Sequence, residues 1–328
     1  MDQAEMLKIM YNNVISQTLS ESGRFLFAGN RFGDIFIQNI EELDNTEIPR
    51  PKVKLYPQGD SGNDINSLVY HRDFLIVGAI GVIYALIWNE DLCKLSTTRA
   101  WEIKIPLQPD AMEVPDVNSL WLRKATDELY AGCGDNKVYQ ISLEDGRIVR
   151  TFEAHSDYIH CVTGYHDQLY TASEDGTVRM WSPKQKEPTA LIEPSNQAQL
   201  MRPEFGNWIG SVAVNADWLV CGGGPKLSIW HLRSLGCTRD FPFPGKIHCC
   251  DFIDDSIIVA GEHNTAQLYA MSGETLASIP LEHTSAYSIV WQQQPTKFMS
   301  ISGYSNKLHI LNHFRFLDSK INLYGNTE

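Results

Sequence analysis

His155, Ser173 and Asp175 are the side chains of this sequence that most resemble a catalytic set, because many hydrolases combine a histidine, a serine and a carboxylate. Trp181 follows them closely, and an aspartate recurs in a similar turn at Asp135. A catalytic triad does not repeat along a chain, whereas a structural motif does. The pattern therefore favours a repeated structural network over a hydrolase site.

Two other groups of residues could suggest a metal site or a phosphate site. Cys249 and Cys250 are adjacent, but the sequence has no Cys-x-x-Cys pair and no His-Glu-x-x-His motif. The glycine run 222–224 follows an expected strand, as phosphate-binding loops do, but Pro225 and another strand come next where a helix should begin. We therefore expect no enzymatic activity, no metal and no cofactor.

The segment from residue 154 to residue 181 indicates how these side chains are positioned. Its alternating apolar residues predict three short strands, with a Glu-Asp-Gly-Thr turn between the second and the third. This pattern is similar to the WD40 repeat, which forms one four-stranded blade of a β-propeller. In such a blade a histidine, a hydroxyl group, an aspartate and a tryptophan form a hydrogen-bonded network. Here these residues are His155, either Thr171 or Ser173, Asp175 and Trp181.

Weaker copies of the segment fill the rest of the chain. The third strands are expected to end at residues 37, 88, 141, 181, 230, 269 and 310, close to the roughly 40–45-residue period of WD40 repeats. We predict an all-β fold, a seven-bladed WD40 β-propeller with a short N-terminal helix. The helical segment covers residues 1–13 and the propeller residues 14–328, with blades at about 14–56, 64–106, 117–153, 155–193, 207–243, 246–280 and 284–324. We expect the blades to close in chain order, without strand exchange.

Composition narrows the possible partners. The formal net charge is −13, and the basic residues are scattered, so we expect no direct binding of nucleic acid, which normally requires a basic surface. No apolar stretch reaches the ~18–20 residues of a membrane span, so no membrane contact is expected. The seven cysteines and the absence of an Asn-x-Ser/Thr site favour an intracellular compartment.

Two segments near the N-terminus are candidate contacts for partner proteins. Apolar residues recur at helical spacing over 3–14, so this helix either packs against the propeller or offers Met6, Met10 and Tyr11 to a partner. The long connection 41–51 is acidic, and Glu41, Glu42 and Asp44 are its candidate contacts. Residues 89–115 and 182–207 are also expected to be long connections, and loops on rigid scaffolds often carry recognition.

Arg233 suggests an alternative function. The sequence Trp230-His231-Leu232-Arg233 resembles the Trp-Asp-x-Arg box of propellers that serve as substrate receptors of cullin-type ubiquitin ligases. It departs from that box at His231, which stands in place of the aspartate. The competing interpretation is that Arg233 is a solvated residue at the end of a strand.

A more specific resemblance covers essentially the whole chain. Asn207-Trp208-Ile209-Gly210, the run 217–225 and the run 230–234 are similar to the WD40-repeat subunits of the THO/TREX assembly, as are the runs 20–26, 113–118 and 157–161. The resemblance implies a nuclear, non-enzymatic scaffold that couples transcription and mRNA processing to mRNA export. It also implies a multi-subunit complex, with the helical THO subunits 5 and 7 as the main partners.

Overall fold

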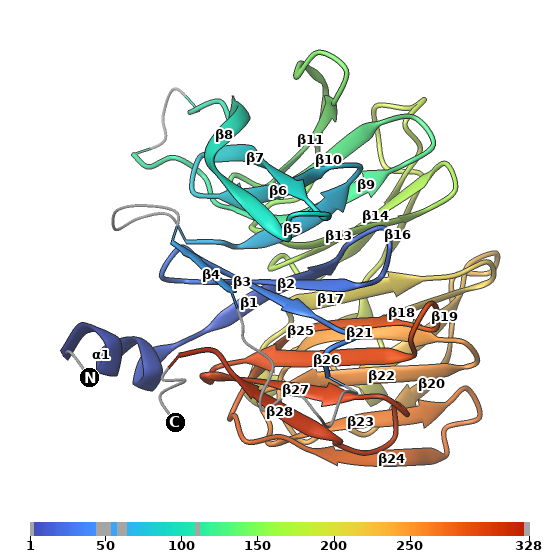
Figure 1. Cartoon of the computed structure of the whole chain (residues 1–328). Helices are drawn as coiled ribbons and strands as arrows, with labels where there is room; N and C mark the ends of the chain where they lie inside the picture. Colours follow the sequence, from blue (N-terminus) through green and yellow to red (C-terminus); the bar gives the residue numbers. More distant parts are fainter. Residues whose placement is uncertain (1–2, 44–53, 58–63, 109–111, 325–328) are drawn as a thin grey trace.

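Seven antiparallel sheets of four strands follow an α-helix, α1 (Gln3–Tyr11), in the described part of the computed structural model (Figure 1). The structure describes residues 3–43, 54–57, 64–108 and 112–324. Within these residues the chain is an all-β, seven-bladed propeller with one short α-helix, and the predicted fold class is confirmed.

Each blade is built from four consecutive strands. The first four blades contain β1 (Val14–Leu19), β2 (Phe25–Asn30), β3 (Asp34–Asn39) and β4 (Lys54–Pro57); β5 (Ser67–His71), β6 (Phe74–Ala79), β7 (Val82–Asn89) and β8 (Lys94–Lys104); β9 (Val117–Arg123), β10 (Glu128–Cys133), β11 (Lys137–Ser142) and β12 (Ile148–Glu153); and β13 (Ile159–Tyr165), β14 (Gln168–Ser173), β15 (Val178–Trp181) and β16 (Ala190–Ile192). The last three contain β17 (Ile209–Val214), β18 (Trp218–Gly223), β19 (Leu227–His231) and β20 (Gly236–Phe241); β21 (Ile247–Ile253), β22 (Ser256–Gly261), β23 (Thr265–Ala270) and β24 (Thr275–Pro280); and β25 (Ala286–Gln292), β26 (Phe298–Gly303), β27 (Lys307–Leu311) and β28 (Ser319–Asn322).

The first strand of every blade lines a central channel, and neighbouring first strands contact each other around the whole ring, including β25 and β1. Blade seven consists of β25 to β28, so the ring closes in chain order, as predicted. We call the end where the first strands begin the entry face, and the opposite end the exit face. The turns between second and third strands also lie at the entry face, because Val14, Asn30 and Asp34 share one end of blade one.

Tight turns at the entry face require particular residues. In blade four Gly176 has a φ of +82°, a left-handed conformation that glycine adopts without steric cost. In blade three Asn136 takes the equivalent turn position with a φ of +69°, and asparagine is among the side chains that tolerate this region best. Both turns then return the chain into a third strand.

The core consists of seven apolar clusters, and each fills the junction between two neighbouring blades. Phe27 and Trp88, for example, join blades one and two. The closing cluster joins Val14 and Leu26 of blade one to Phe298 and other residues of blade seven. Every blade therefore packs its apolar side chains against both of its neighbours.

A polar latch accompanies this closing cluster. Asn30 donates hydrogen bonds to Asn12 at 2.7 Å and to the Tyr324 hydroxyl at 2.8 Å, and that hydroxyl donates in turn to Asp34. The buried Asp34 carboxylate also binds the Lys8 ammonium at 2.6 Å. The latch therefore ties α1, blade one and the C-terminal strand together.

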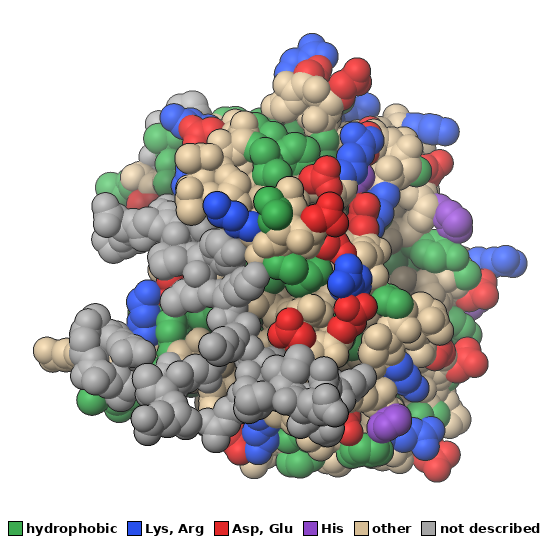
Figure 2. Space-filling model, in the orientation of Figure 1, with side chains coloured by type: hydrophobic (Ala, Val, Ile, Leu, Met, Phe, Trp, Pro, Cys, Tyr) green, Lys and Arg blue, Asp and Glu red, His purple; other side chains and the backbone are tan. Residues whose placement is uncertain are grey.

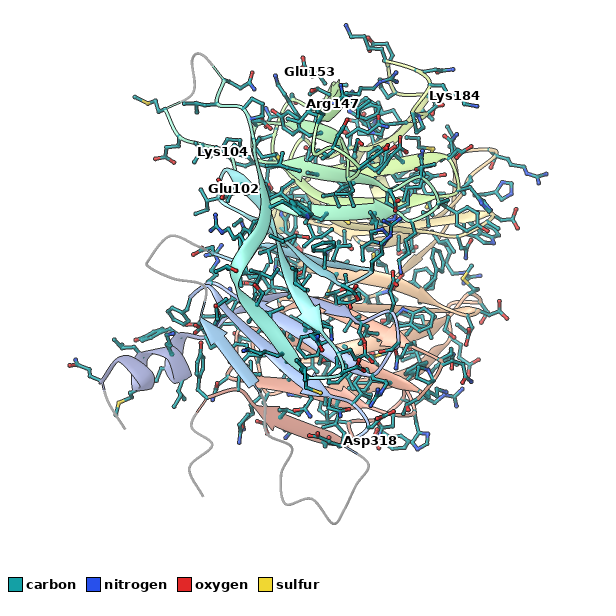
Figure 3. The ribbon with its side chains drawn as sticks, turned by 45° about the horizontal axis from the view of Figure 1, so that its top comes forward. Glu102, Lys104, Arg147, Glu153, Lys184 and Asp318 are labelled. Carbon is teal, nitrogen blue, oxygen red and sulfur yellow. The ribbon has the colours of Figure 1, made fainter. Side chains whose placement is uncertain are left out.

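One expected connection contains a long strand. Residues 89–115 contain β8, whose eleven residues form the outer edge of blade two, so the expectation of a long loop is wrong for residues 94–104. The apolar residues of β8 are separated by charged ones, and Figure 3 labels Glu102 and Lys104 on it. Charged side chains on an outer strand hinder its pairing with strands of other chains.

Candidate functional site

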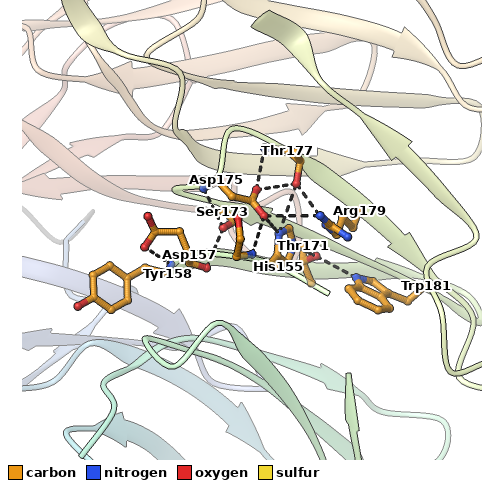
Figure 4. A network of polar contacts seen from close by, with 10 residues as sticks. His155, Asp157, Tyr158, Thr171, Ser173, Asp175, Thr177, Arg179 and Trp181 are labelled. Carbon is orange, nitrogen blue, oxygen red and sulfur yellow. Dashed lines mark hydrogen bonds and ion pairs between the residues drawn. The ribbon is translucent and has the colours of Figure 1, made fainter. Parts of the chain in front are cut away.

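The four residues of the expected network meet within blade four (Figure 4). The Trp181 indole N–H donates to the Thr171 hydroxyl at 2.9 Å, and that hydroxyl lies 2.7 Å from His155 Nε2. His155 Nδ1 lies 2.8 Å from the Asp175 carboxylate. Since the carboxylate can only accept, His155 donates from Nδ1 and its Nε2 accepts from Thr171. The hydrogen bonds therefore link the segment before β13, the strand β14, the turn that follows β14 and the strand β15.

Thr171, rather than Ser173, is the hydroxyl residue of this network. The Ser173 hydroxyl donates to the Asp157 carbonyl at 2.9 Å and accepts from the Asp175 backbone N–H at 3.1 Å, so it shapes the turn. Thr177, which the sequence did not single out, donates to Asp175 at 2.6 Å. The residues that looked like a triad therefore do not form a serine–histidine pair.

The network is buried, and its histidine and aspartate each have a defined protonation state near pH 7. Burial lowers the pKa of His155, partly opposed by its hydrogen bond to Asp175, so the ring is neutral near pH 7. Burial alone would raise the pKa of Asp175, but hydrogen bonds from His155 and Thr177 lower it overall. A neutral histidine held between a threonine and an ionised aspartate, away from solvent, supports a structural role.

Arg202 is a residue that the sequence reasoning missed. It lies in the connection between blades four and five, which follows β16 and contains three short 3₁₀ helices, η1 (Pro194–Asn196), η2 (Ala198–Leu200) and η3 (Pro203–Phe205). Its guanidinium donates to the backbone carbonyls of residues 223, 224, 225, 243 and 245, at 2.8 to 3.1 Å. Arg202 therefore fixes this connection to blades five and six. Carbonyl acceptors leave no trace in side-chain identity, so no sequence pattern could have revealed it.

Helix α1 presents an apolar face to solvent. Met6, Met10 and Tyr11 are 46%, 61% and 54% exposed, and Leu7 extends the same face. The opposite side of the helix is fixed by Ile9, which packs against the closing cluster, and by the Lys8–Asp34 ion pair. One side of this helix thus packs on the propeller, whereas the contact of its exposed side with a partner stays a prediction.

The acidic candidates lie at the other end of blade one. Glu41 pairs with Arg24 at 3.2 Å, and Glu42 accepts from the Asn39 side chain at 3.4 Å, both beyond the exit-face end of β3. Asp44 lies outside the described residues. Helix α1 and this acidic turn are the two candidate contacts near the N-terminus. The blade separates them, since α1 joins β1 at the entry face.

Arg233 is exposed in the turn that follows β19, at the exit face of blade five. His231, the residue that departs from the ubiquitin-ligase box, packs its ring against Trp218 and lies 3.1 Å from the Ser234 hydroxyl. His231 thus takes part in local packing at this turn.

Among the residues that the structure describes, no group of three or more histidine, cysteine, aspartate or glutamate side chains is arranged to hold a metal ion. The same part of the chain contains no helix that is long and apolar enough to cross a membrane.

Comparison with known proteins places the chain among WD40 propellers. The family described as WD domain, G-beta repeat, matches residues 146–182, which include the whole hydrogen-bonded network. The solved WD40 β-propeller domain of Doa1 superposes with a TM-score of 0.72 over 91% of this chain and 92% of that domain, at 14% identity. At that identity the likeness describes the fold alone.

Sequence relatives are more specific. THO complex subunit 6 of Drosophila melanogaster is 58% identical over 98% of this chain and 92% of its own length. THO complex subunit 6 of Homo sapiens is 30% identical over 95% of this chain and 93% of its own length. The chain therefore belongs to the THO complex subunit 6 family, a non-catalytic family of WD40 propellers.

Proposed function

We propose that this chain is a non-enzymatic scaffold subunit of a nuclear THO/TREX complex, where it binds other THO subunits and couples transcription and mRNA processing to mRNA export. Membership of the THO complex subunit 6 family supports this role and favours it over the ubiquitin-ligase alternative. A closed ring suits a scaffold, because its blades share their cores and keep attached partners in fixed positions.

The observation that carries the proposal is the exposed apolar face of α1. Met6, Leu7, Met10 and Tyr11 lie on one side of the helix, while the latch holds the other side on the propeller. An anchored helix with an uncovered apolar face is suited to pack against a second helix, as in helix-on-helix recognition. Methionine side chains adapt well to such contacts. We therefore propose a helical partner, with THO subunits 5 and 7 as the candidates.

The charge distribution supports a protein partner over RNA. The net charge is −13, and Figure 2 shows acidic and basic side chains interspersed on the visible face, without a continuous basic band. Phosphate binding depends on such a band, since neutralising the backbone supplies most of the affinity. A chain of this charge repels RNA at long range unless another subunit contributes cations.

Aspartate substitutions on α1 test the proposal. The double variant Met6→Asp and Met10→Asp places two charges on the exposed face and leaves Ile9 and Lys8 in place, so the fold should persist. We expect it to lose co-purification of subunits 5 and 7 from cells. Leu92→Asp is the matched control, because Leu92 is 71% exposed but lies at the exit face of blade two, and it should co-purify normally. Equal recovery with the double variant and with the wild type would refute the α1 contact.

The acidic turn is tested separately, because it lies at the opposite face. Reversing Glu41 and Glu42 to lysine should weaken assembly in a salt-dependent way if a basic partner surface docks there. The Arg24–Glu41 pair is surface-exposed, so its loss should cost little stability. Unchanged co-purification at low salt would exclude this turn as a contact and leave the α1 proposal intact.

A further inference from the structure

The seven first strands enclose a channel of about 720 Å³ along the ring axis. Most of the side chains that line it are small or polar, such as Ser67, Ser119 and Ser211. The mouth at the entry face differs from this lining. There, aromatic side chains from blades four to seven occupy one half of the rim, and the amides Asn66 and Asn118 of blades two and three face them.

These rings form a continuous row, which we call the aromatic arc: His160, Trp208, His248 and Tyr287. The His160 and Trp208 centroids are 5.7 Å apart in an edge-on arrangement, and Trp208 stacks on His248 at 5.5 Å with an interplanar angle of 27°. His248 and Tyr287 follow at 4.8 Å. All four rings remain partly accessible to solvent. Burial lowers the pKa of His248 to about 4, so its ring is neutral near pH 7 and does not repel a cation.

The chain holds Trp208 at this position. Its indole N–H donates to the Phe205 carbonyl at 2.9 Å, and Phe205 belongs to the short helix that Arg202 fixes to blades five and six. Gly210 provides the space, because a Cβ atom there would lie 2.5 Å from the Trp208 ring. The glycine and the arginine thus explain why the sequence Asn207-Trp208-Ile209-Gly210 places an indole on the channel rim.

The charges at the mouth leave an excess of carboxylate. The two lining cations already have acidic partners, since Arg31 lies 4.0 Å from Asp64 and Lys246 lies 3.1 Å from Glu262. The Glu174 carboxylate instead bonds to His160, at 2.5 Å.

Two further carboxyl groups lie in this region, and burial shifts both toward the neutral form. Burial raises the pKa of Asp116, and the charge of nearby Asp64 raises it further. Asp251 lies deeper in the channel, where burial raises the pKa of its carboxyl to about 6. A site with this field and a row of π faces attracts cations and repels phosphate.

We propose that the entry-face mouth binds the side chain of an arginine carried by an extended segment of a partner protein. The planar guanidinium stacks on the aromatic arc, and its N–H groups donate to the free oxygen of Glu174 and to the amide oxygens across the mouth. Arginine fits better than lysine because it combines a flat stacking surface with a fork of donors. The site is separate from the α1 contact, so either proposal can fail without the other.

Short peptides test this site on the intact protein. The probes are acetyl-Gly-Arg-Gly-amide, its lysine counterpart, and a citrulline counterpart that keeps the planar shape without the charge. Saturation-transfer NMR on the side chain of the probe reports binding, and the Trp208 indole resonance shows whether the peptide binds at the channel mouth. We expect the arginine peptide to bind and to shift Trp208, the lysine peptide to bind more weakly, and the citrulline peptide to show no effect.

Matched variants separate the site from general attraction to an acidic protein. Glu174→Gln should weaken binding of the arginine peptide by about tenfold or more, because it removes a charge-assisted hydrogen bond. Trp208→Leu should abolish binding, whereas Trp218→Leu should not, since Trp218 makes an edge-on contact with His231 at the exit face. Equal binding of arginine and citrulline, or unchanged affinity in Glu174→Gln, would overturn the proposal. So would a Trp208 shift caused by oligouridylate and not by the arginine peptide.

Discussion

Thr171 carries the hydrogen-bonded network of blade four through one hydroxyl group, which accepts from Trp181 and donates to His155. Thr171→Val keeps the shape of the side chain but leaves a buried indole N–H and a buried imidazole nitrogen unpaired. We expect the free energy of unfolding to fall by about 2–6 kcal/mol, since each of the two buried groups left unpaired costs about 1–3 kcal/mol. Urea unfolding measures this. Ser173→Ala should cost less, and a Thr171→Val protein as stable as the wild type would show that the network is dispensable.

Arg202 is a second residue whose role depends on geometry alone. Lysine keeps its charge but has three donors where the guanidinium has five, so Arg202→Lys cannot reach all of its carbonyl acceptors. We expect a loss of about 1–3 kcal/mol in unfolding free energy, together with a shift in Trp208 fluorescence as the connection loosens. An unchanged emission spectrum would mean that other contacts hold Trp208.

At the scale of elements, ring closure depends on the polar latch as well as on the closing apolar cluster. Tyr324→Phe removes the hydroxyl that donates to Asp34 and accepts from Asn30. The buried Asp34 carboxylate then retains only its ion pair with Lys8 from the latch. We expect a loss of about 1–3 kcal/mol and faster proteolysis near the C-terminal strand. If cleavage instead begins in other blades and β28 stays protected, the apolar cluster alone closes the ring.

The elements that the sequence predicted well are those with a repeated local signal. The turn at Asp175-Gly176 and the terminal Trp181 follow from alternation, turn residues and spacing. Features assembled from several blades could not be predicted in this way. The aromatic arc joins rings that are far apart in the chain. The separation of α1 from Glu41 depends on which end of a strand each one follows.

At the scale of the whole molecule, buried histidines make stability depend on pH. Burial lowers the pKa of His248 and His309 to about 4 and that of His283 to about 3, and it lowers the pKa of His155 as well. The unfolded chain therefore binds more protons than the folded ring once the pH falls below about 6.5. The stabilisation is complete above that pH and is lost progressively as the pH falls toward about 4.

Unfolding free energies measured between about pH 7.5 and about pH 5 should thus decline with acidification. The net negative charge also becomes smaller, and the weaker self-repulsion opposes part of this decline. His248→Asn removes one of the protonating groups and should make the decline shallower. Stability that stays constant over this range would contradict a buried, neutral state for these rings.

The two ends of the ring are chemically different. The entry face carries α1 and the aromatic arc, whereas the exit face carries the acidic turn at Glu41 and the exposed Arg233. A rigid ring with distinct ends can hold separate partners at once, which suits a scaffold. Substitutions that abolish binding at the entry face should therefore leave binding at the exit face unchanged.

Hydrogen exchange of this chain, alone and in complex with the other THO subunits, tests the scaffold account most directly. If a helical partner packs on α1, the amides of residues 3–11 should become strongly protected in the complex, while the inner strands, already protected by the ring, should change little. Exchange in α1 that is identical in the free and the assembled protein would contradict the account.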